Sequence, residues 1–305
     1  MKQLLLTAGP GDAAERLDRF LAKAGGISRG EARRLLERGS VWVDGKRVKA
    51  ASRALRPGQA ITLVLEEAGR RQQQGHDALD ASRILYEDAH LVAVDKPPFV
   101  PAQPTLASDR DDLLALASAL TGCRLGLVHR LDSETSGVTL FAKTEVGVLT
   151  QAFRERRVHK RYLALVMSAE ALPDEGVIDL AISSDPTRPG RQRAIPKGKL
   201  PALTRFRCVE RCRAGTALVE AFPETGRTHQ IRAHLEAMGA PLLGDKLYGG
   251  LASLTMDGTD SNRIAIPRVM LHASAIELEH PATRKPLRIE APLPEDFGAL
   301  LVQVR

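Results

Sequence analysis

Residues 127–137 read Leu-Val-His-Arg-Leu-Asp-Ser-Glu-Thr-Ser-Gly, and the apolar run Val138–Phe141 follows them directly. The apolar run predicts a strand, and the polar stretch before it predicts a loop at the start of that strand. This loop holds more reactive side chains than a simple turn needs. From the residues alone, two interpretations are equally good: Asp132 caps backbone groups of Ser133 or Thr135 in a structural turn, or the loop carries out chemistry.

On either side of this loop, residues 83–305 alternate between strand and helix patterns without regular βαβ spacing. Such an order predicts an α+β domain with a mixed or antiparallel central sheet. The clearest strands are expected at 84–86, 91–95, 138–141, 162–166 and 217–222, and the clearest helices at 146–157 and 228–238.

Several common catalytic motifs are missing from the sequence. Gly9-Pro10-Gly11 has neither the spacing nor the lysine of a phosphate-binding loop, and the chain contains no Gly-x-Ser-x-Gly elbow between a predicted strand and a helix and no His-Glu-x-x-His. His229 and His234 are five residues apart, so they point to different faces of a helix and make a poor metal pair. The cysteines lack the spacing of a zinc site and are expected to be free thiols: Cys123, Cys208 and Cys212. We therefore expect no metal and no nucleotide or other cofactor.

The positive charge is concentrated in one part of the chain. The net charge is +7 and the pI about 9.5, and residues 15–56 hold 12 Lys or Arg against 5 Asp or Glu, which accounts for the whole excess. Such a local excess favours a polyanionic partner. The sequence has no apolar run of membrane-spanning length and no basic amphipathic helix, so we expect no membrane contact and a cytoplasmic protein.

Within this basic segment, Leu17–Leu21 and Arg29–Arg38 predict two helices, the second opened by a capping box of Ser28 and Glu31. A hairpin with a type I′ turn at Asp44-Gly45 is expected to follow. A run of charged residues like this one most often forms a solvent-exposed helix face. Only two acidic residues balance the four arginines of the second helix, however, so we expect these side chains to contact phosphate: Arg29, Arg33, Arg34, Arg38, Lys46 and Arg47.

Residues 66–82 contain few apolar side chains and show no periodicity, which is typical of a flexible linker, and His76 within them is expected to be solvated. The sequence therefore predicts a small basic domain at 1–65, a linker at 66–82 and a larger domain at 83–305.

The basic segment, from Arg16-Leu-Asp-Arg-Phe-Leu21 to Val41-Trp-Val-Asp-Gly-Lys-Arg-Val48, resembles the S4 RNA-binding domain over about fifty residues. This resemblance implies binding to structured RNA, with phosphates held by the basic side chains of the helix and the hairpin.

The loop around Asp132 resembles the catalytic motif of the RluA-type RNA pseudouridine synthases, and all seven fixed positions of His129-Arg-Leu-Asp-x-x-Thr-Ser-Gly137 match. Other segments match the family in the same order: Ile84–Asp88 with Val94–Pro97, Lys160–Val166, Gly226–Arg232 with Leu243–Gly249, Met270–Ala273 and His280-Pro281. One departure follows Lys96-Pro97, where the family often has a Gly and a His-Pro pair but this chain reads Pro98-Phe-Val-Pro-Ala-Gln-Pro104. That loop is expected to contact RNA, so the departure bears on the choice of substrate.

The resemblance implies a role for each site residue. Asp132 is expected to be the catalytic nucleophile, or the base of a glycal route, and must be ionised in either case. Arg227 is expected to pair with Asp132, because burial without a nearby cation would favour the protonated acid. Tyr162 is expected to stack on the uracil. Arg130 is expected to fill the space left by the flipped nucleotide, and Lys160 either to contact phosphate or to support the sheet.

Three neighbouring side chains are expected to support the site. His129 could carry a proton, but a core histidine that holds a backbone carbonyl is the favoured interpretation. Gln230 and Arg232, on the helix that follows Arg227, are expected to be structural.

Together, the resemblances imply a monomeric RNA pseudouridine synthase that acts without metal or organic cofactor. The appended S4-like domain favours ribosomal RNA of the large subunit, with transfer RNA as an alternative. A non-catalytic RNA-binding or ribosome-assembly factor is the main rival, although the intact Asp132 motif argues against it. A nuclease would need a metal cluster or a pair of acids, and the sequence shows neither.

Overall fold

The computed structural model describes residues 2–65, 79–109, 112–256 and 263–305. The chain folds into two compact units, one made from residues 1–79 and 99–122, and one from residues 80–98 and 123–305. No helix in the described ranges is long and apolar enough to cross a membrane.

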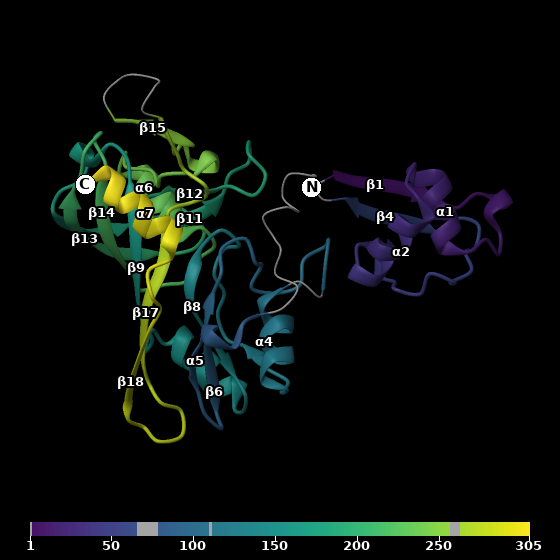
Figure 1. The fold of residues 1–305 in the computed structure, drawn as a ribbon, viewed down its shortest axis with the longest axis horizontal. Coiled ribbons are helices and arrows are strands. Elements are labelled where there is room, and N and C mark those ends of the chain that lie inside the picture. The colour runs from purple at the N-terminus through teal and green to yellow at the C-terminus, as the bar shows by residue number, and fades with distance from the viewer. Residues whose placement is uncertain (1, 66–78, 110–111, 257–262) are drawn as a thin grey trace. The chain divides into compact units, whose positions relative to one another are not determined.

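The part of the first unit before residue 66 contains a small antiparallel sheet and two α-helices (Figure 1). Its sheet has the order β1-β4-β2-β3, and its core contains Leu17, Leu21, Leu36 and Leu63. The elements before residue 66 are β1 (Lys2–Thr7), η1 (Pro10–Asp12), α1 (Leu17–Gly25), α2 (Arg29–Arg38), β2 (Val41–Val43), β3 (Lys46–Arg47) and β4 (Ala60–Leu65). The two helices followed by a hairpin that the sequence predicts for the basic segment are thereby confirmed.

The Ser28 half of the predicted capping box and the predicted type I′ turn are confirmed in this unit, while the Glu31 half of the box stays a prediction. The Ser28 hydroxyl accepts a hydrogen bond from the Glu31 amide at 3.1 Å and so caps α2, while the Glu31 carboxylate pairs with Arg34. Asp44 and Gly45 have φ angles of 51° and 73°, and two successive left-handed residues define the type I′ turn.

Residues 99–122, which contain α4 (Leu113–Thr121), also belong to this first unit. The Trp42 indole donates to the Leu106 carbonyl at 3.1 Å, and the Ser40 hydroxyl donates to the Ala107 carbonyl. Nothing in the local sequence signals these contacts. Most of the expected linker, residues 66–78 with His76, lies outside the described residues, so the division at 65 and 82 stays a prediction.

The second unit is built on a ten-stranded sheet with the main order β10-β13-β14-β9-β17-β8-β6-β5, in which β18 pairs with β17 and β7 with β8. Only β17 and β8 run parallel among these pairs, so the expected mixed sheet of an α+β domain is confirmed. The strands are β5 (Ile84–Glu87), β6 (Leu91–Lys96), β7 (Gly126–Leu127), β8 (Ser136–Ala142), β9 (His159–Val166), β10 (Glu175–Asp179), β13 (Leu203–Arg211), β14 (Ala217–Pro223), β17 (Leu271–Glu279) and β18 (Pro286–Glu290).

Smaller elements complete this unit. Two short strand pairs lie outside the main sheet, β11 (Ala181–Ser184) with β12 (Gln192–Ile195) and β15 (Ser253–Thr255) with β16 (Arg263–Ala265). The helices are α5 (Val146–Arg154), α6 (Gln230–Ala237) and α7 (Glu295–Val304), with 3-10 turns η2 (Ala81–Arg83), η3 (Ala169–Ala171) and η4 (Lys246–Tyr248).

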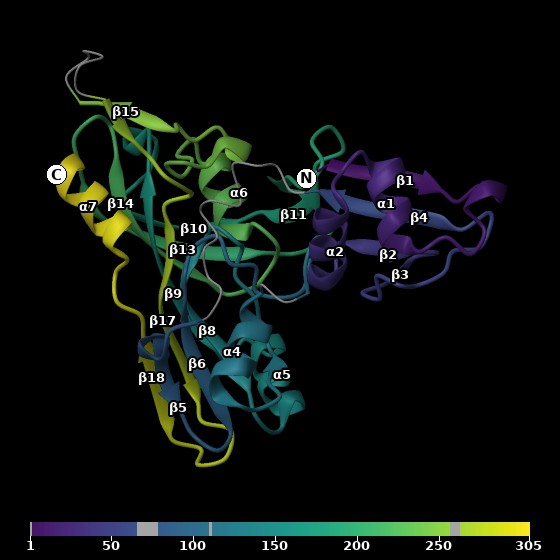
Figure 2. The same cartoon turned by 45° about the vertical axis from the view of Figure 1, so that its right-hand side comes forward.

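Helices cover both faces of the main sheet (Figure 2). Successive side chains of a strand point to opposite faces, and in these strands apolar side chains lie on both. Along β9, Tyr162 and Ala164 pack with Ile231 of α6, whereas Leu165 packs with Phe297 of α7. The third helix, α5, packs on β6, β8 and β17 through a separate apolar cluster. A strand that is buried on both faces cannot shift its register, so the residues it carries toward the site are fixed.

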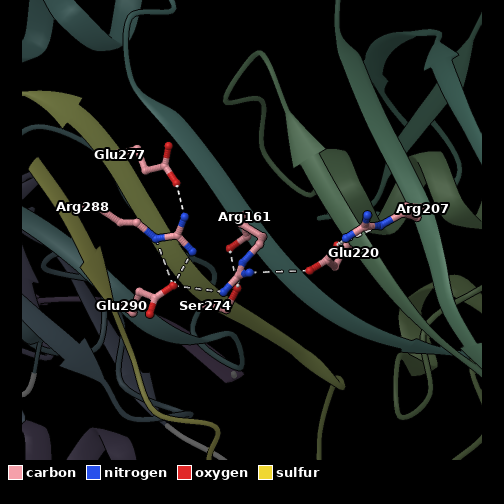
Figure 3. Close-up of polar contacts among 7 residues, drawn as sticks. All are labelled: Arg161, Arg207, Glu220, Ser274, Glu277, Arg288 and Glu290. Atoms are coloured by element: carbon pink, nitrogen blue, oxygen red, sulfur yellow. Dashed lines mark hydrogen bonds and ion pairs between the residues drawn. The ribbon is translucent and has the colours of Figure 1, made fainter. Parts of the chain in front are cut away.

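On part of the sheet face that α7 covers elsewhere, the strands carry charged side chains (Figure 3). On β9, Arg161 donates to Ser274 at 3.1 Å and lies 3.3 Å from Glu290 and 3.6 Å from Glu220. The ladder of ion pairs runs across five strands and holds three arginines and three glutamates: Arg161, Arg207, Arg288, Glu220, Glu277 and Glu290. This ladder is neutral and its guanidinium groups are already paired, so it offers little attraction to a polyanion.

The parallel pairing of β8 with β17 depends on Gly137. Its φ angle is +110°, and a Cβ atom there would lie 2.2 Å from the Ala273 carbonyl oxygen. A side chain at this position would therefore separate the two strands that hold the Asp132 loop.

We expect Gly137→Ala to lower the free energy of unfolding by about 1–3 kcal/mol or more, because the new methyl group meets backbone and the left-handed conformation becomes strained. Urea unfolding at equilibrium measures the change. Gly147→Ala is the matched control, since nothing lies within 4 Å of its added Cβ and alanine favours α5. Equal unfolding midpoints for the two variants would contradict this role of Gly137.

Candidate active site

One pocket of about 510 Å³ brings most of the expected site residues together. It lies in the second unit, where the loop before β8 meets β9 and the segment from the end of β14 into α6. All eight residues that the sequence assigned to chemistry or to support of the site line it: His129, Arg130, Asp132, Lys160, Tyr162, Arg227, Gln230 and Arg232.

The Asp132 carboxylate lies in this pocket with 27% of its side chain exposed. Its Oδ2 atom is 3.3 Å from Nη1 of Arg232 and 3.8 Å from Nε2 of His229. Arg232 in turn makes a bidentate pair with the buried Asp245, at 2.6 and 2.8 Å. Burial opposes the charge of Arg232, but its hydrogen bonds with Asp245 and the nearby carboxylates raise its pKa, so a fixed cation stands beside Asp132.

The expected pairing of Arg227 with Asp132 is therefore wrong, because Arg232 occupies that place. Arg227 precedes α6, its side chain is exposed, and its Nε donates to the Pro201 carbonyl at 3.2 Å. Arg232 is nearly buried within α6, close to the positive end of the helix, where a cation needs acidic partners. The acidic Asp245 in the segment Leu243–Gly249 could have indicated that Arg232, and not Arg227, is the arginine held beside Asp132.

Tyr162 is buried and reaches the pocket from β9. Burial raises the pKa of its hydroxyl well above the ordinary value, and the Asp132 charge adds to this rise. The phenol is therefore neutral at physiological pH, because burial and the charge of Asp132 both oppose the loss of its proton. The expected stacking of its ring on a base stays a prediction.

His129 has a structural place in the site. Its Nε2 accepts a hydrogen bond from the Leu140 amide at 2.8 Å, and its ring stacks on Phe153 with 4.7 Å between ring centroids. Burial lowers the pKa of His129 to about 3, with a further contribution from Lys160, so the ring is neutral. A core histidine was expected, and it is confirmed, although it binds an amide and not a carbonyl.

Two buried basic side chains hold the backbone that follows Asp132. Nζ of Lys96 donates to the carbonyls of Ser133 and Pro97 at 2.8 and 2.9 Å, and burial lowers the pKa of Lys96 to about 7. Nη1 of Arg268 donates to the Glu134 carbonyl at 3.3 Å. Arg268 has no exposed side-chain surface, and Asp296 of α7 holds it at 2.6 and 2.9 Å. No pattern in the sequence predicts the Arg268 contact.

Lys160 and Gln230 support the segment after β14. Nζ of Lys160 donates to the Thr225 carbonyl at 2.9 Å, and burial lowers its pKa to about 8. The Gln230 side chain donates to the Leu203 carbonyl at 3.0 Å and accepts from the Arg227 amide at 3.1 Å. The structural role expected for Gln230 is confirmed, whereas phosphate contact by Lys160 stays a prediction.

In the first unit, one buried carboxylate organises three of the arginines. Asp18 has no exposed surface and lies 3.1, 3.0 and 3.1 Å from Nε of Arg16, Arg29 and Arg33, whose side chains are about half exposed. These arginines, Arg16 above all, hold the pKa of Asp18 well below its ordinary value. The cluster is an ordered set of guanidinium groups with a surplus of positive charge.

The other expected phosphate contacts differ in their surroundings. Arg34 pairs with Glu31, and Arg47 donates to the Thr105 carbonyl, lies 3.3 Å from Asp109 and stacks over the Trp42 ring at 4.6 Å. Only 18% of the Arg47 side chain is exposed, so it is a weaker candidate for RNA contact than Arg29 or Arg33. Lys46 is exposed at the hairpin turn, and Arg38 lies in the last turn of α2.

No cluster of three or more His, Cys, Asp or Glu side chains in the described parts of the chain could hold a metal ion. The three cysteines are free thiols.

Comparisons with known proteins agree with this geometry. The family model described as RNA pseudouridylate synthase matches residues 90–237, and the S4 domain model matches residues 15–61. A ribosomal large subunit pseudouridine synthase D from Xylella fastidiosa is 40% identical over 73% of this chain and 69% of its own length. One from Xanthomonas campestris is 34% identical over 96% of this chain and 90% of its own. Among solved structures, human RNA pseudouridylate synthase domain containing 4 superimposes with a TM-score of 0.55 at 27% identity, covering 73% of this chain and 93% of the human one.

The low pKa of His129 makes stability depend on pH in a defined window. The unfolded chain binds a proton at this histidine near pH 6.5, whereas the folded protein does so only near pH 3. The unfolded state therefore holds more protons between pH 3 and 6.5, and stability must fall as the pH falls through that range.

We expect wild type to lose stability relative to His129→Gln between pH 6.5 and 3, by at most about 1.4 kcal/mol per pH unit. Glutamine can still accept from the Leu140 amide but does not titrate. Urea unfolding of both proteins at half-unit pH steps gives the difference. Parallel curves across this window would rule out a buried neutral His129.

Proposed function

The chain belongs to the RNA pseudouridylate synthase family and is an isomerase that acts on RNA, and we propose that it converts uridine to pseudouridine in large-subunit ribosomal RNA with Asp132 as its catalytic carboxylate. The observation that carries this proposal is the ion pair of Asp132 with Arg232 inside the pocket. The ribosomal substrate is supported by the names of the relatives from Xylella and Xanthomonas and by the S4 domain.

The reaction breaks the C1′–N1 bond of uridine and joins C5 of the same uracil to C1′. C5 gives up its proton, and N1 gains one. Asp132 can attack C1′ as a nucleophile, or remove a sugar proton as a base in a glycal route. Both routes use the ionised carboxylate, and the guanidinium of Arg232 at 3.3 Å stabilises that charge. Asp245 keeps Arg232 in place, so the cation need not move when a substrate enters.

Tyr162 and Arg130 complete the proposed mechanism. The uracil must turn between bond cleavage and bond formation, and the neutral ring of Tyr162 offers a flat surface for that base. Arg130 extends from the Asp132 loop, with its Nη2 3.1 Å from the Thr228 hydroxyl. Its exposed side chain can take the place of the uridine that leaves the RNA stack.

The S4 unit contributes RNA binding and supplies no residue of the pocket. We assign its phosphate contacts first to the cluster of Arg16, Arg29 and Arg33 on Asp18, and next to Arg34, Arg38, Lys46 and Arg47. We further propose that the enzyme works as a monomer, in the cytoplasm where its substrate is made, and without cofactor, since isomerisation needs neither electrons nor an added group.

Asp132→Asn should abolish turnover and leave RNA affinity within about threefold, because this near-isosteric change removes the nucleophilic charge and little else. A pseudouridine map of total RNA from cells lacking the gene, rescued with wild type or with this variant, tests the proposal. Sites in large-subunit ribosomal RNA should return only with wild type. Sites confined to transfer RNA would replace the proposed substrate, and an unchanged map would support a binding factor.

Arg29→Ala with Arg33→Ala should weaken RNA binding and lower the salt dependence of its affinity by roughly one unit of log K against log[salt] per lost phosphate contact. Titrations of ribosomal RNA fragments at several salt concentrations measure this slope. Arg34→Ala is the matched control from the same helix, and its ion pair with Glu31 predicts a smaller change. Equal slopes for the control and the double variant would count against the Asp18 cluster.

A further inference from the structure

The C-terminal end of α5 forms one wall of the pocket that contains Asp132. Four residues from this end line it: Thr150, Phe153, Arg154 and Arg156. Both arginines are exposed, and neither forms an ion pair with any residue that the structure describes. The adjacent Arg157, in contrast, pairs with Glu155 at 2.7 Å and does not line the pocket. Within the described residues, two guanidinium groups without a carboxylate partner thus stand beside the site.

The backbone at this end of α5 is unusual. Arg156 has a φ of +59°, a left-handed conformation that L side chains with a Cβ rarely adopt. Three hydrogen bonds close the turn, from the amides of Glu155, Arg156 and Arg157 to carbonyls of α5 at 2.9, 3.2 and 2.9 Å. Glycine or asparagine would fit this turn with less strain. Strain at a residue that lines a site is an observation from which a function can be inferred.

The favourable interaction of a cation with the helix dipole does not by itself explain why Arg154 and Arg156 lie at the pocket. A helix C-terminus favours any nearby cation, and both Arg156 and the paired Arg157 follow the end of α5 directly in the sequence. What distinguishes Arg154 and Arg156 from Arg157 is that they reach the pocket and lack a carboxylate partner among the described residues.

The charge of the pocket identifies the ligand class. Its lining includes six cationic side chains, Arg130, Arg154, Arg156, Lys160, Arg227 and Arg232, against two carboxylates, Asp132 and Glu224. Glu224 is already paired with Arg205 at 2.8 Å, and Arg232 with Asp245 at 2.6 Å, so five cationic side chains remain against Asp132. A pocket with this surplus attracts anions, and a ribose placed against Asp132 carries a phosphodiester on each side.

We propose that Arg154 and Arg156 form a phosphate-binding subsite for the RNA backbone beside the target nucleotide. This inference rests on the proposed function, because it takes the uridine to be bound at Asp132. Arginine suits the role, since its planar fork can donate two hydrogen bonds to one phosphate. The subsite holds the strand at the pocket while the base is out of the stack, and its contribution is to binding and not to the chemical step.

Binding is measured in an Asp132→Asn background, so that turnover does not alter the RNA. An in vitro transcript of large-subunit ribosomal RNA is titrated at several salt concentrations. Arg154→Ala and Arg156→Asn should each lower the salt slope by roughly 0.7–0.9. Asparagine tolerates the left-handed turn, so the second variant should stay folded. Arg157→Ala should keep the slope of the parent, and Arg156→Lys should retain most of it because the charge remains.

Turnover by the same arginine variants with Asp132 restored gives a second readout. A phosphate-binding role predicts a higher KM and a kcat within about twofold of wild type at saturating RNA. Unchanged slopes and KM in variants that fold normally would overturn the subsite. A lower affinity with an unchanged slope would also overturn it and would point to stacking of the guanidinium groups on bases.

Failure of the subsite and failure of the proposed function give different results. If wild type forms pseudouridine but the arginine variants keep their slopes, only the subsite is wrong. If the slopes fall but wild type modifies no RNA, the phosphate contacts stand and the isomerase assignment to ribosomal RNA fails.

Discussion

The site depends on one electrostatic constraint, which is that the loop bearing Asp132 is held by cations that are themselves buried. Arg232 fixes the carboxylate, while Lys96 and Arg268 hold the carbonyls of the next two residues. Each buried charge is costly to remove from water, and each is compensated by a carboxylate or by backbone oxygen atoms. Asp245 and Asp296 provide the carboxylates for the two arginines. Among the described residues, losing Asp296 would leave Arg268 without a carboxylate partner, and losing Asp245 would leave Arg232 paired with Asp132 alone.

The sheet brings together residues that are far apart in the sequence. The strands β8, β17 and β9 are neighbours, so the loop before β8 comes to lie beside Tyr162 on β9. This arrangement requires β8 and β17 to approach closely at Gly137, where no side chain fits. Helix α6 then packs on the same face as Tyr162 and carries Arg232 into the pocket. The geometry of the site is therefore a property of the whole sheet.

Much of this organisation could be predicted from the sequence where signals are local. The cap at Ser28, the turn at Asp44-Gly45 and the polar loop before an apolar run all depend on neighbouring residues. The site residues were identified by motif, but their partners were not. Choosing Arg232 over Arg227 requires knowing that α6 begins at Gln230 and that Asp245 folds back onto it. The contact of Arg268 with Glu134 spans 134 residues and has no local pattern.

The separation in sequence between the Asp132 loop and the residues that hold it also bears on the order of events during synthesis. Arg232 follows Asp132 by 100 residues, and Asp296 is made later still. A nascent chain therefore carries the Asp132 loop and Lys96 well before Arg232 and Arg268, which also hold that loop, have left the ribosome. The helices and hairpin of the S4 domain are made first, so RNA-binding surface emerges ahead of catalytic competence. A growing chain would then carry its RNA-binding domain while it is still unable to modify RNA.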